Sequence, residues 1–297
     1  MSVQAAYLAV IVIWSTTPLT IQWSAEGIGF SAGVTSRMII GTVVCLLLVK
    51  LLRIEMPWHK QARWAYLAGA VAVFGAMSSV YFASQYISSG LIAVLFGLTP
   101  VVTTVIAVLS GQERMPTLSK VAGIVTALSG LIIIFSLGED AVISEDSNAL
   151  FYGGIGMLAC VFLHSLSAIW VKQTAQGLPA LAVTTGSLVF SVPLYVLTWL
   201  LVDGQLPLEV PARTGFAILY LAVIGSVVGY VLYFYSLKHI SVSKMALVTL
   251  ITPVTALILG SVLNGEIISS SIWFGTVLIL IGLSLHQWGA RLRFRYA

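Results

Sequence analysis

The chain has 297 residues, of which 59% are hydrophobic and 8% are charged, and its mean hydropathy is +1.04. Soluble domains carry about 25% charged residues, so this composition excludes a water-soluble fold. The formal net charge of +4 does not indicate a nucleic-acid partner, because the basic residues follow a membrane topology described below.

Ten apolar stretches recur from one end of the chain to the other, and each is long enough to cross a bilayer of about 30 Å at about 1.5 Å per residue. We expect helices, because a backbone in lipid must satisfy its own hydrogen bonds and the pattern of strands is absent. No Lys or Arg precedes the first stretch and no small-residue cleavage site follows it, so we do not expect a cleaved signal peptide. The stretches are 4–23, 30–52, 63–85, 87–109, 117–137, 150–172, 179–202, 213–237, 241–263 and 271–290.

Basic residues gather on one side of the predicted membrane. An even number of spans puts both termini on the same side, and twelve of the fourteen Lys and Arg residues then fall on that side, whereas eight of the ten acids fall on the other. This asymmetry predicts that both termini are cytoplasmic, and that the basic tail 291–297 anchors at anionic headgroups. The twelve are Lys50, Arg53, Lys60, Arg63, Arg114, Lys120, Lys172, Lys238, Lys244, Arg291, Arg293 and Arg295.

Polar residues interrupt the first two spans. In the first, Trp14, Ser15 and Thr17 precede Pro18, which removes a backbone donor and frees the carbonyl of Trp14. We expect this break to line a cavity; a kink packed against protein is the alternative. The second span carries Arg37, an expensive residue in lipid and a candidate for binding a carboxylate. Alternatively, Arg37 holds helix ends together, through Glu26 or free carbonyls, or extends outward to the interface.

The third and eighth spans carry polar and aromatic residues at matched places. Ser78, Tyr81 and Gln85 share one helical face by their spacing. A comparable stripe in the eighth span consists of Ser226, Tyr230 and Tyr233. Such stripes are more often interfacial or packing residues. Because the two stripes occupy corresponding positions, we expect them to form walls of a cavity.

The fourth and ninth spans contain a repeated block. Residues 98–113 read LTPVVTTVIAVLSGQE, and residues 251–266 read ITPVTALILGSVLNGE. In both copies a threonine precedes a proline within the span, and a glutamate follows thirteen residues after the proline. We expect the prolines to break opposed helices and the glutamates to be gate or helix-end residues. The residues are Thr99, Pro100 and Glu113 in the first copy and Thr252, Pro253 and Glu266 in the second.

The remaining spans offer one candidate functional residue. His164 is the histidine deepest in a span, where an ionisable group marks a pathway as often as it serves packing. Glycines seven residues apart in the fifth and tenth spans predict close packing of two peripheral helices. Cys45 and Cys160 have no metal-ligand spacing and are expected to act as small hydrophobic residues.

The repeat predicts the architecture. Each half holds five spans, an odd number, so the second half enters the membrane in the opposite sense. The fold class is therefore an all-α polytopic membrane protein of two inverted five-helix repeats, residues 1–138 and 150–290. Inverted repeats with broken helices are a recurrent transporter architecture, with the substrate near the midplane.

These features together resemble the EamA-type transporters of the drug/metabolite transporter superfamily. The resemblance covers the whole chain and is carried by Trp14-Ser15, Arg37, and the two Thr-Pro-Val blocks with Glu113 and Glu266. It implies an inner (plasma) membrane exporter of small organic metabolites, often amino acids, with a central cavity lined by spans 1–4 and 6–9. The glycine common after the first tryptophan is Ser15 here, which alters the polarity expected of the cavity.

We therefore expect an exporter of amino acids or similar amphipathic zwitterions, working by alternating access. Cationic drugs or other metabolites are the alternative substrates, and a membrane enzyme or a channel is the rival class. No Asp or Glu lies mid-span, which predicts facilitated export or weak coupling rather than strong proton antiport. We expect no catalytic residue, metal, cofactor or nucleic acid, and a monomer in the bilayer, with a dimer as the alternative. The expected cavity residues are Trp14, Ser15, Thr17, Arg37, Ser78, Tyr81, Gln85, Thr99, His164, Tyr230, Tyr233 and Thr252.

Overall fold

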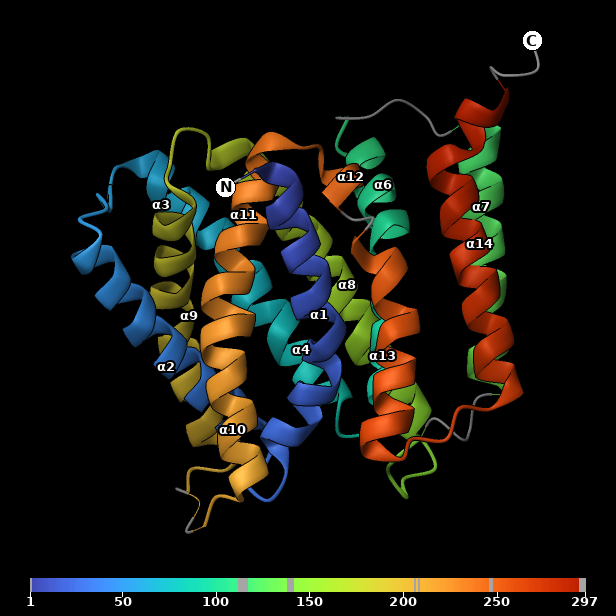
Figure 1. Cartoon of the computed structure of the whole chain (residues 1–297), viewed down its shortest axis with the longest axis horizontal. Coiled ribbons are helices and arrows are strands. Elements are labelled where there is room, and N and C mark those ends of the chain that lie inside the picture. The colour runs from blue at the N-terminus through green and yellow to red at the C-terminus, as the bar shows by residue number, and fades with distance from the viewer. Residues whose placement is uncertain are drawn as a thin grey trace.

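A computed structural model describes residues 2–111, 117–137, 142–205, 207, 209–245 and 248–293 (Figure 1). Over these ranges the regular structure is helical, apart from one isolated bridge between Ile87 and Val142. The expectation of an all-helical protein is confirmed. Glu113 lies outside the described residues, as do 294–297 of the basic tail.

The helices up to residue 137 are called the first half here, and those from residue 149 the second half. The first half contains α1 (Val3–Ala25), α2 (Phe30–Leu51), α3 (Lys60–Ala70), η1 (Val71–Ala76), α4 (Met77–Ala83), α5 (Ser89–Phe96), α6 (Thr99–Leu109) and α7 (Leu118–Leu137). The second contains α8 (Ala149–Thr174), α9 (Ala180–Val202), α10 (Ala212–Tyr220), η3 (Leu221–Val228), α11 (Gly229–His239), α12 (Val242–Met245), α13 (Val248–Asn264) and α14 (Ser270–Arg293).

Many of these helices are long and apolar enough to cross a membrane. Within the described ranges, seven helical stretches meet that standard, among them the continuous runs Lys60–Ala83, Ser89–Leu109 and Ala212–His239. Three shorter apolar helices lie at other predicted spans, namely Leu118–Ile134, Ile251–Asn264 and Ser270–His286. The chain is thus a multi-pass membrane protein by length and composition, and the total of ten spans stays a prediction.

The two halves interleave at the centre of the bundle (Figure 1). α1, from the first half, packs against α10, α11 and α13 of the second half. α8, from the second half, packs against α3, η1, α4, α5 and α6 of the first half. α2 and α9 pack together on one flank. Because each central helix has its neighbours in the other half, the core of the molecule is an interface between halves.

α7 and α14 form a separate pair at the opposite edge of the molecule (Figure 1). They approach so closely that a Cβ built on Gly123 would lie 2.5 Å from the carbonyl oxygen of Gly282. A Cβ on Gly130 would lie 2.5 Å from the carbonyl oxygen of Gly275. Small residues allow such close contact between helices in lipid, where van der Waals packing replaces the hydrophobic effect. The predicted peripheral glycine packing of these two spans is confirmed.

The three prolines predicted to break helices differ from one another. Pro100 lies at the start of α6, and α5 ends at Phe96, so the fourth span is interrupted there. Thr99 Oγ1 donates to the Phe96 carbonyl oxygen at 2.5 Å, which satisfies the carbonyl that the proline frees. Pro18 and Pro253, by contrast, lie inside α1 and α13, which continue through them. The prediction of a helix break is therefore wrong for these two.

Hydroxyl groups account for the continuity of α1 through Pro18. Thr17 Oγ1 donates to the Ile13 carbonyl oxygen at 2.8 Å, and Thr16 Oγ1 donates to the same oxygen at 2.9 Å. A proline removes one backbone hydrogen bond from a helix, and nearby Ser and Thr side chains compensate for such a loss in a membrane. The polar residues around Pro18 thus sustain the helix through the proline.

Two π-helical segments occupy corresponding places in the halves. η1 joins α3 to α4 in the third span, and η3 joins α10 to α11 in the eighth. A π-helical turn is wider than an α-helical turn and shifts the face that the following residues present. Met77 directly follows η1, and Gly225 and Ser226 lie within η3. These segments bring residues of both spans to the centre of the bundle.

Candidate functional site

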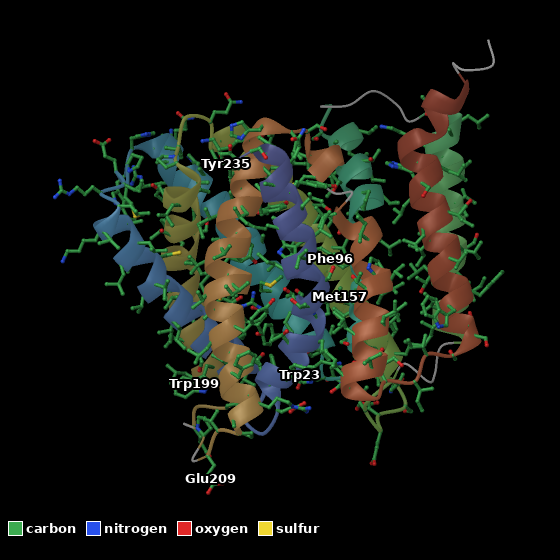
Figure 2. The ribbon with its side chains drawn as sticks, in the orientation of Figure 1. Trp23, Phe96, Met157, Trp199, Glu209 and Tyr235 are labelled. Atoms are coloured by element: carbon green, nitrogen blue, oxygen red, sulfur yellow. The ribbon has the colours of Figure 1, made fainter. Side chains whose placement is uncertain are left out.

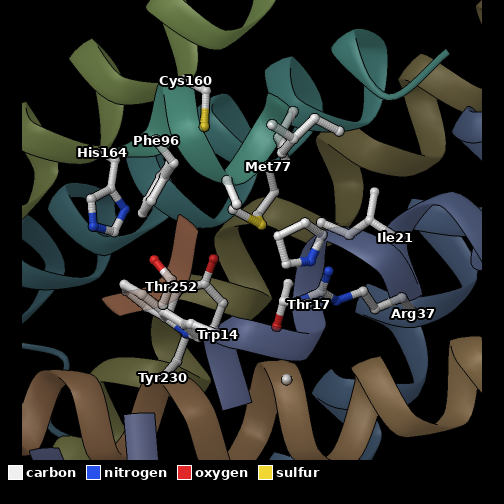
Figure 3. A pocket seen from close by; sticks show the side chains of 15 residues that line it. Trp14, Thr17, Ile21, Arg37, Met77, Phe96, Cys160, His164, Tyr230 and Thr252 are labelled. Carbon is white, nitrogen blue, oxygen red and sulfur yellow. The ribbon is translucent and has the colours of Figure 1, made fainter. Parts of the chain in front are cut away.

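A cavity of about 60 Å³ lies between the two halves. Phe96, one of its lining residues, lies near the middle of the bundle (Figure 2). One water needs about 10–15 Å³ on this measure, so the cavity has room for only a few waters. Figure 3 shows Arg37 on one side of the pocket, and His164 and Phe96 on the other. The lining residues are Trp14, Thr17, Pro18, Ile21, Arg37, Met77, Val80, Ile92, Ala93, Phe96, Cys160, His164, Gly225, Tyr230 and Thr252.

Arg37 brings a buried positive charge to this cavity. Its side chain is 1% exposed. Nε donates to Ser226 Oγ at 2.9 Å, and Nη1 lies 3.5 Å from the Tyr81 hydroxyl, which also contacts Ser24 Oγ at 3.0 Å. The alternative of a partnership with Glu26 is wrong, because that carboxylate pairs with Arg213. In the part of the chain that the structure describes, no carboxylate lies within ion-pair distance of Arg37.

The opposite side of the cavity is aromatic. Ring centroids of Trp14 lie 5.5 Å from His164, 6.0 Å from Phe96 and 5.0 Å from Tyr233. His164 in turn lies 5.1 Å from Phe96, and its Nε2 is 3.2 Å from the Tyr233 hydroxyl. The Nδ1 atom of His164 is buried without a hydrogen-bond partner. The four rings form one packed cluster, and His164 is its polar member.

A smaller hollow of about 10 Å³ continues on the far side of this aromatic cluster. It shares Trp14 and His164 with the main cavity and adds Thr99 and Tyr233, together with Thr103. Thr103 Oγ1 donates to Ser165 Oγ at 3.0 Å. The structure thus brings two more of the predicted residues to the same region, separated from the main cavity by the aromatic side chains.

Other predicted residues lie elsewhere. Ser15 donates to the Ile11 carbonyl oxygen at 2.8 Å, and neither Ser15 nor Ser78 lines either hollow. Tyr81 contacts Arg37 through its hydroxyl and does not itself line the cavity. The placement of Gln85 in the cavity is wrong: the residue is exposed, and Nε2 donates to the Phe82 carbonyl oxygen at 3.3 Å. The reason is that α4 ends at Ala83, so the helical spacing that relates Ser78 and Tyr81 does not extend to residue 85.

Glu266 caps a helix of the other half. Its carboxylate accepts hydrogen bonds from Ser89 Oγ at 2.6 Å, from Ser89 N at 3.1 Å and from Gly90 N at 3.1 Å. These amides open α5, and a negative charge there complements the helix dipole. Gly265, with φ +66°, permits the chain to turn back after α13 so that Glu266 reaches α5. The expected partner residue Glu113 lies outside the described residues.

Further polar contacts join the halves at this same end of the bundle, the lower end in Figure 1. Ser31 at the start of α2 donates to the Asp203 carboxylate just after α9. Arg213 at the start of α10 pairs with Glu26 just after α1. Trp23 Nε1 donates to Asn264 Oδ1 at 3.0 Å. Together with Glu266, these contacts link the two halves across the lower end.

Sequence reasoning missed the apolar part of the wall. Met77, Phe96, Cys160 and Gly225 line the cavity, but an apolar residue within an apolar span carries no signal of function. Ser226, the partner of Arg37, stands four residues before Tyr230 on the predicted stripe. Among the described residues, no three or more His, Cys, Asp or Glu side chains form a group that would hold a metal ion.

Comparisons with known proteins agree with a membrane transporter. A profile of the EamA-like transporter family matches residues 2–136 and 151–286. The chain is 22% identical to a probable terminal-alkyne amino-acid exporter of Streptantibioticus cattleyicolor, over 94% of this chain and 91% of the relative. It is 25% identical to a probable amino-acid metabolite efflux pump of Salmonella typhimurium, over 76% of each chain.

Two further similarities span almost the whole chain. An uncharacterized inner membrane transporter, YedA, of Escherichia coli K12 is 24% identical over 93% of this chain and 90% of the relative. A solved crystal structure superposes with a TM-score of 0.69 at 19% sequence identity, covering 98% of both chains, and shares the fold.

A helical membrane bundle with a polar and aromatic cavity at its centre defines the class as a membrane transport protein. The chain belongs to the EamA-like transporter family, because the family profile matches it over nearly its whole length. The resemblance to the drug/metabolite transporters is thereby confirmed, as is the location of a multi-pass protein in the inner membrane.

Proposed function

We propose that this protein exports small amphipathic carboxylates, a class that includes amino acids, across the inner membrane by alternating access. In this proposal the chain forms ten spans in two inverted five-helix repeats, residues 1–138 and 150–290, with both termini and the 291–297 tail in the cytoplasm. The asymmetry of Lys and Arg supports the orientation. The matched positions of η1 and η3 support the repeat.

The observation that carries the proposal is the buried guanidinium of Arg37 at the edge of the central cavity. A buried charge without a counter-charge is costly, by several kcal/mol, and is kept in membrane proteins mainly where it serves function. Arginine recognises a carboxylate through two parallel hydrogen bonds. The substrate carboxylate binds Arg37, and its apolar part lies against Trp14 and Phe96. The amino-acid substrates in the names of two relatives support this class.

The polar contacts at the lower end define the state of the transporter. With the termini in the cytoplasm, this end faces outward, and the contacts of Glu266, Asp203 and Glu26 hold it closed. Transport then requires these contacts to break while the halves rock about the cavity. Glu266 is a helix-end residue in this scheme, and it acts as a gate because its partners belong to the other half.

Counterflow in proteoliposomes tests the proposal. Vesicles containing purified protein are loaded with one amino acid or carboxylate at a time, and uptake of labelled compound is measured. Arg37→Ala should reduce uptake at least tenfold, since one bidentate charged pair contributes about 1.5–3 kcal/mol. Arg37→Lys keeps the positive charge but cannot make two parallel hydrogen bonds, so this variant should retain part of the activity. Wild-type transport by both variants, with normal folding, would exclude the carboxylate role.

The same assay separates the rival functions. A carrier is stimulated by substrate on the opposite side, whereas a channel is not, so absence of counterflow with measurable flux would favour a channel. Cationic drugs are disfavoured as substrates because Arg37 repels them, and the screen includes tetraphenylphosphonium to test this. An enzyme would instead change the chemical identity of the recovered compound, which mass spectrometry of the vesicle contents detects.

A further inference from the structure

Among the described residues, no acid lies within ion-pair distance of Arg37 to neutralise its positive charge. Each of the ten Asp and Glu residues lies between the apolar stretches, and none lies within one. Three acids at the lower end of the bundle are engaged elsewhere: Glu26 with Arg213, Asp203 with Ser31, and Glu266 with the start of α5. The described protein partners of the guanidinium are hydroxyl groups.

The guanidinium also retains donor capacity. Only Nε makes a hydrogen bond of ordinary length, since the contact of Nη1 with Tyr81 is 3.5 Å. Among the described residues, Nη2 has no acceptor; it lies 3.3 Å from the position that a Cβ on Gly225 would take. Because Gly225 has no side chain, there is space beside Nη2 of the guanidinium. A ligand with two oxygen atoms would satisfy Nη1 and Nη2 together.

Among the described residues, the cavity wall offers a cation no negatively charged group. The remaining polar groups are the hydroxyls of Thr17, Tyr230 and Thr252 and the imidazole of His164, none of which supplies a negative charge. Aromatic faces bind ammonium groups, but the Trp14 ring is already packed against three other rings at 5.0–6.0 Å. A substrate ammonium would therefore be desolvated here without a compensating charge.

We propose that the preferred substrate is an amphipathic monocarboxylate that carries no ammonium group, such as a 2-oxo acid, and that it crosses as a net anion. This inference rests on the proposed function and narrows its substrate class. One negative charge leaves the cell with each substrate. The membrane potential, negative inside, therefore drives export directly, with no proton required.

A matched pair of probes tests the inference. Leucine and 4-methyl-2-oxopentanoate share a carbon skeleton and differ only in the amino or oxo group. Proteoliposomes receive a potassium gradient and valinomycin, which sets the lumen about 100 mV positive. A monoanion should then accumulate in the lumen up to about 50-fold. Moving one charge through 100 mV changes the equilibrium ratio of inside to outside concentration by about this factor. The oxo acid should accumulate, and leucine should not respond to the potential.

Control variants address the role of Arg37. Arg37→Gln removes the charge and should reduce flux of the oxo acid at least tenfold. Arg37→Lys should keep the response to the potential with a raised KM.

Each outcome is decisive. Leucine flux that exceeds oxo-acid flux, or oxo-acid flux that ignores the potential, would overturn the inference while leaving the proposed carrier intact. Wild-type KM for the oxo acid in Arg37→Gln would overturn it as well. If neither probe nor any other compound in the counterflow screen moves, the proposed function itself fails.

Discussion

At the scale of single residues, His164 combines ring packing with a hydrogen bond in the cavity wall. It contacts Trp14, Phe96 and Tyr233 through its ring, and its Nε2 pairs with the Tyr233 hydroxyl. The ring contacts do not depend on the ring being an imidazole. The hydrogen bond requires the imidazole, and its loss would leave the buried Tyr233 hydroxyl without this partner.

We expect His164→Phe to lower stability while leaving transport within about threefold of wild type. The stranded Tyr233 hydroxyl should cost about 1–3 kcal/mol, whereas removal of both polar groups in His164→Phe/Tyr233→Phe should recover much of the loss. Thermal unfolding in detergent measures the stability of the wild type, the two single variants and the double variant. Counterflow measures their activity. Complete loss of transport in a folded His164→Phe protein would instead assign His164 a direct role with substrate.

Several residues of the wall were predictable because they are unusual in lipid. Arg37, His164, Trp14, Thr17 and Thr252 stand out in apolar spans, and all five line the cavity. Phe96 and Met77 were not predictable, since their chemistry matches that of any lipid-facing residue. Gln85 was misplaced because its predicted face assumed a helix that ends two residues earlier, at Ala83.

At the scale of elements, the N-terminus of α5 is held by a residue from the other half. Ser88 Oγ accepts from Leu91 N within the helix, and Glu266 accepts from Ser89 and Gly90. This contact joins positions 177 residues apart. Hydrogen-bond partners at such separation cannot be read from local pattern, so the sequence suggested a helix-end glutamate without indicating which helix it caps.

Glu266→Ala should destabilise the outer-closed state by about 1–3 kcal/mol, because it leaves buried amide donors without an acceptor. Glu26→Ala is the matched control: its pair with Arg213 is exposed, with side chains 38% and 50% accessible, and such pairs contribute about 0–1 kcal/mol. Melting temperature and the rate of counterflow are measured for both. Equal effects of the two substitutions would contradict the prediction that Glu266 contributes more than Glu26 to the contacts between the halves.

The three prolines differ in how they affect the helices that contain them. All three interrupt a span in the sequence, yet only Pro100 coincides with the end of one helix and the start of another. Pro18 is accommodated because neighbouring hydroxyls bond to the backbone. The two π-helical segments had no recognisable signal in the residues that form them, and both pack against helices of the other half.

At the scale of the whole molecule, hydropathy predicted the helical bundle, and the division into two inverted repeats stays a prediction. Repeat and hydropathy did not predict the interleaving of α1 and α8, because contacts between distant helices depend on shape rather than on pattern. The contacts across the lower end were not predictable either, since they depend on which loops meet there.

Cys160 provides a native reporter of the proposed closure of the outer end. It lines the cavity and is 0% exposed, and Cys45 is removed as Cys45→Ala for the measurement. A membrane-impermeant methanethiosulfonate added outside should label Cys160 slowly, and Glu266→Ala should accelerate labelling several-fold by opening the outer end. Labelling from outside that is equally fast in both proteins would contradict the assignment of a closed outer end.

The interleaved core also sets the order in which the protein is assembled during synthesis. α1 is synthesised before α10, α11 and α13, its neighbours from the second half, which begin only at residue 212. Until then the face of α1 that these three helices cover lies against lipid or the insertion machinery. Because Thr252 of α13 lines the cavity, no nascent chain that ends before α13 contains a complete one.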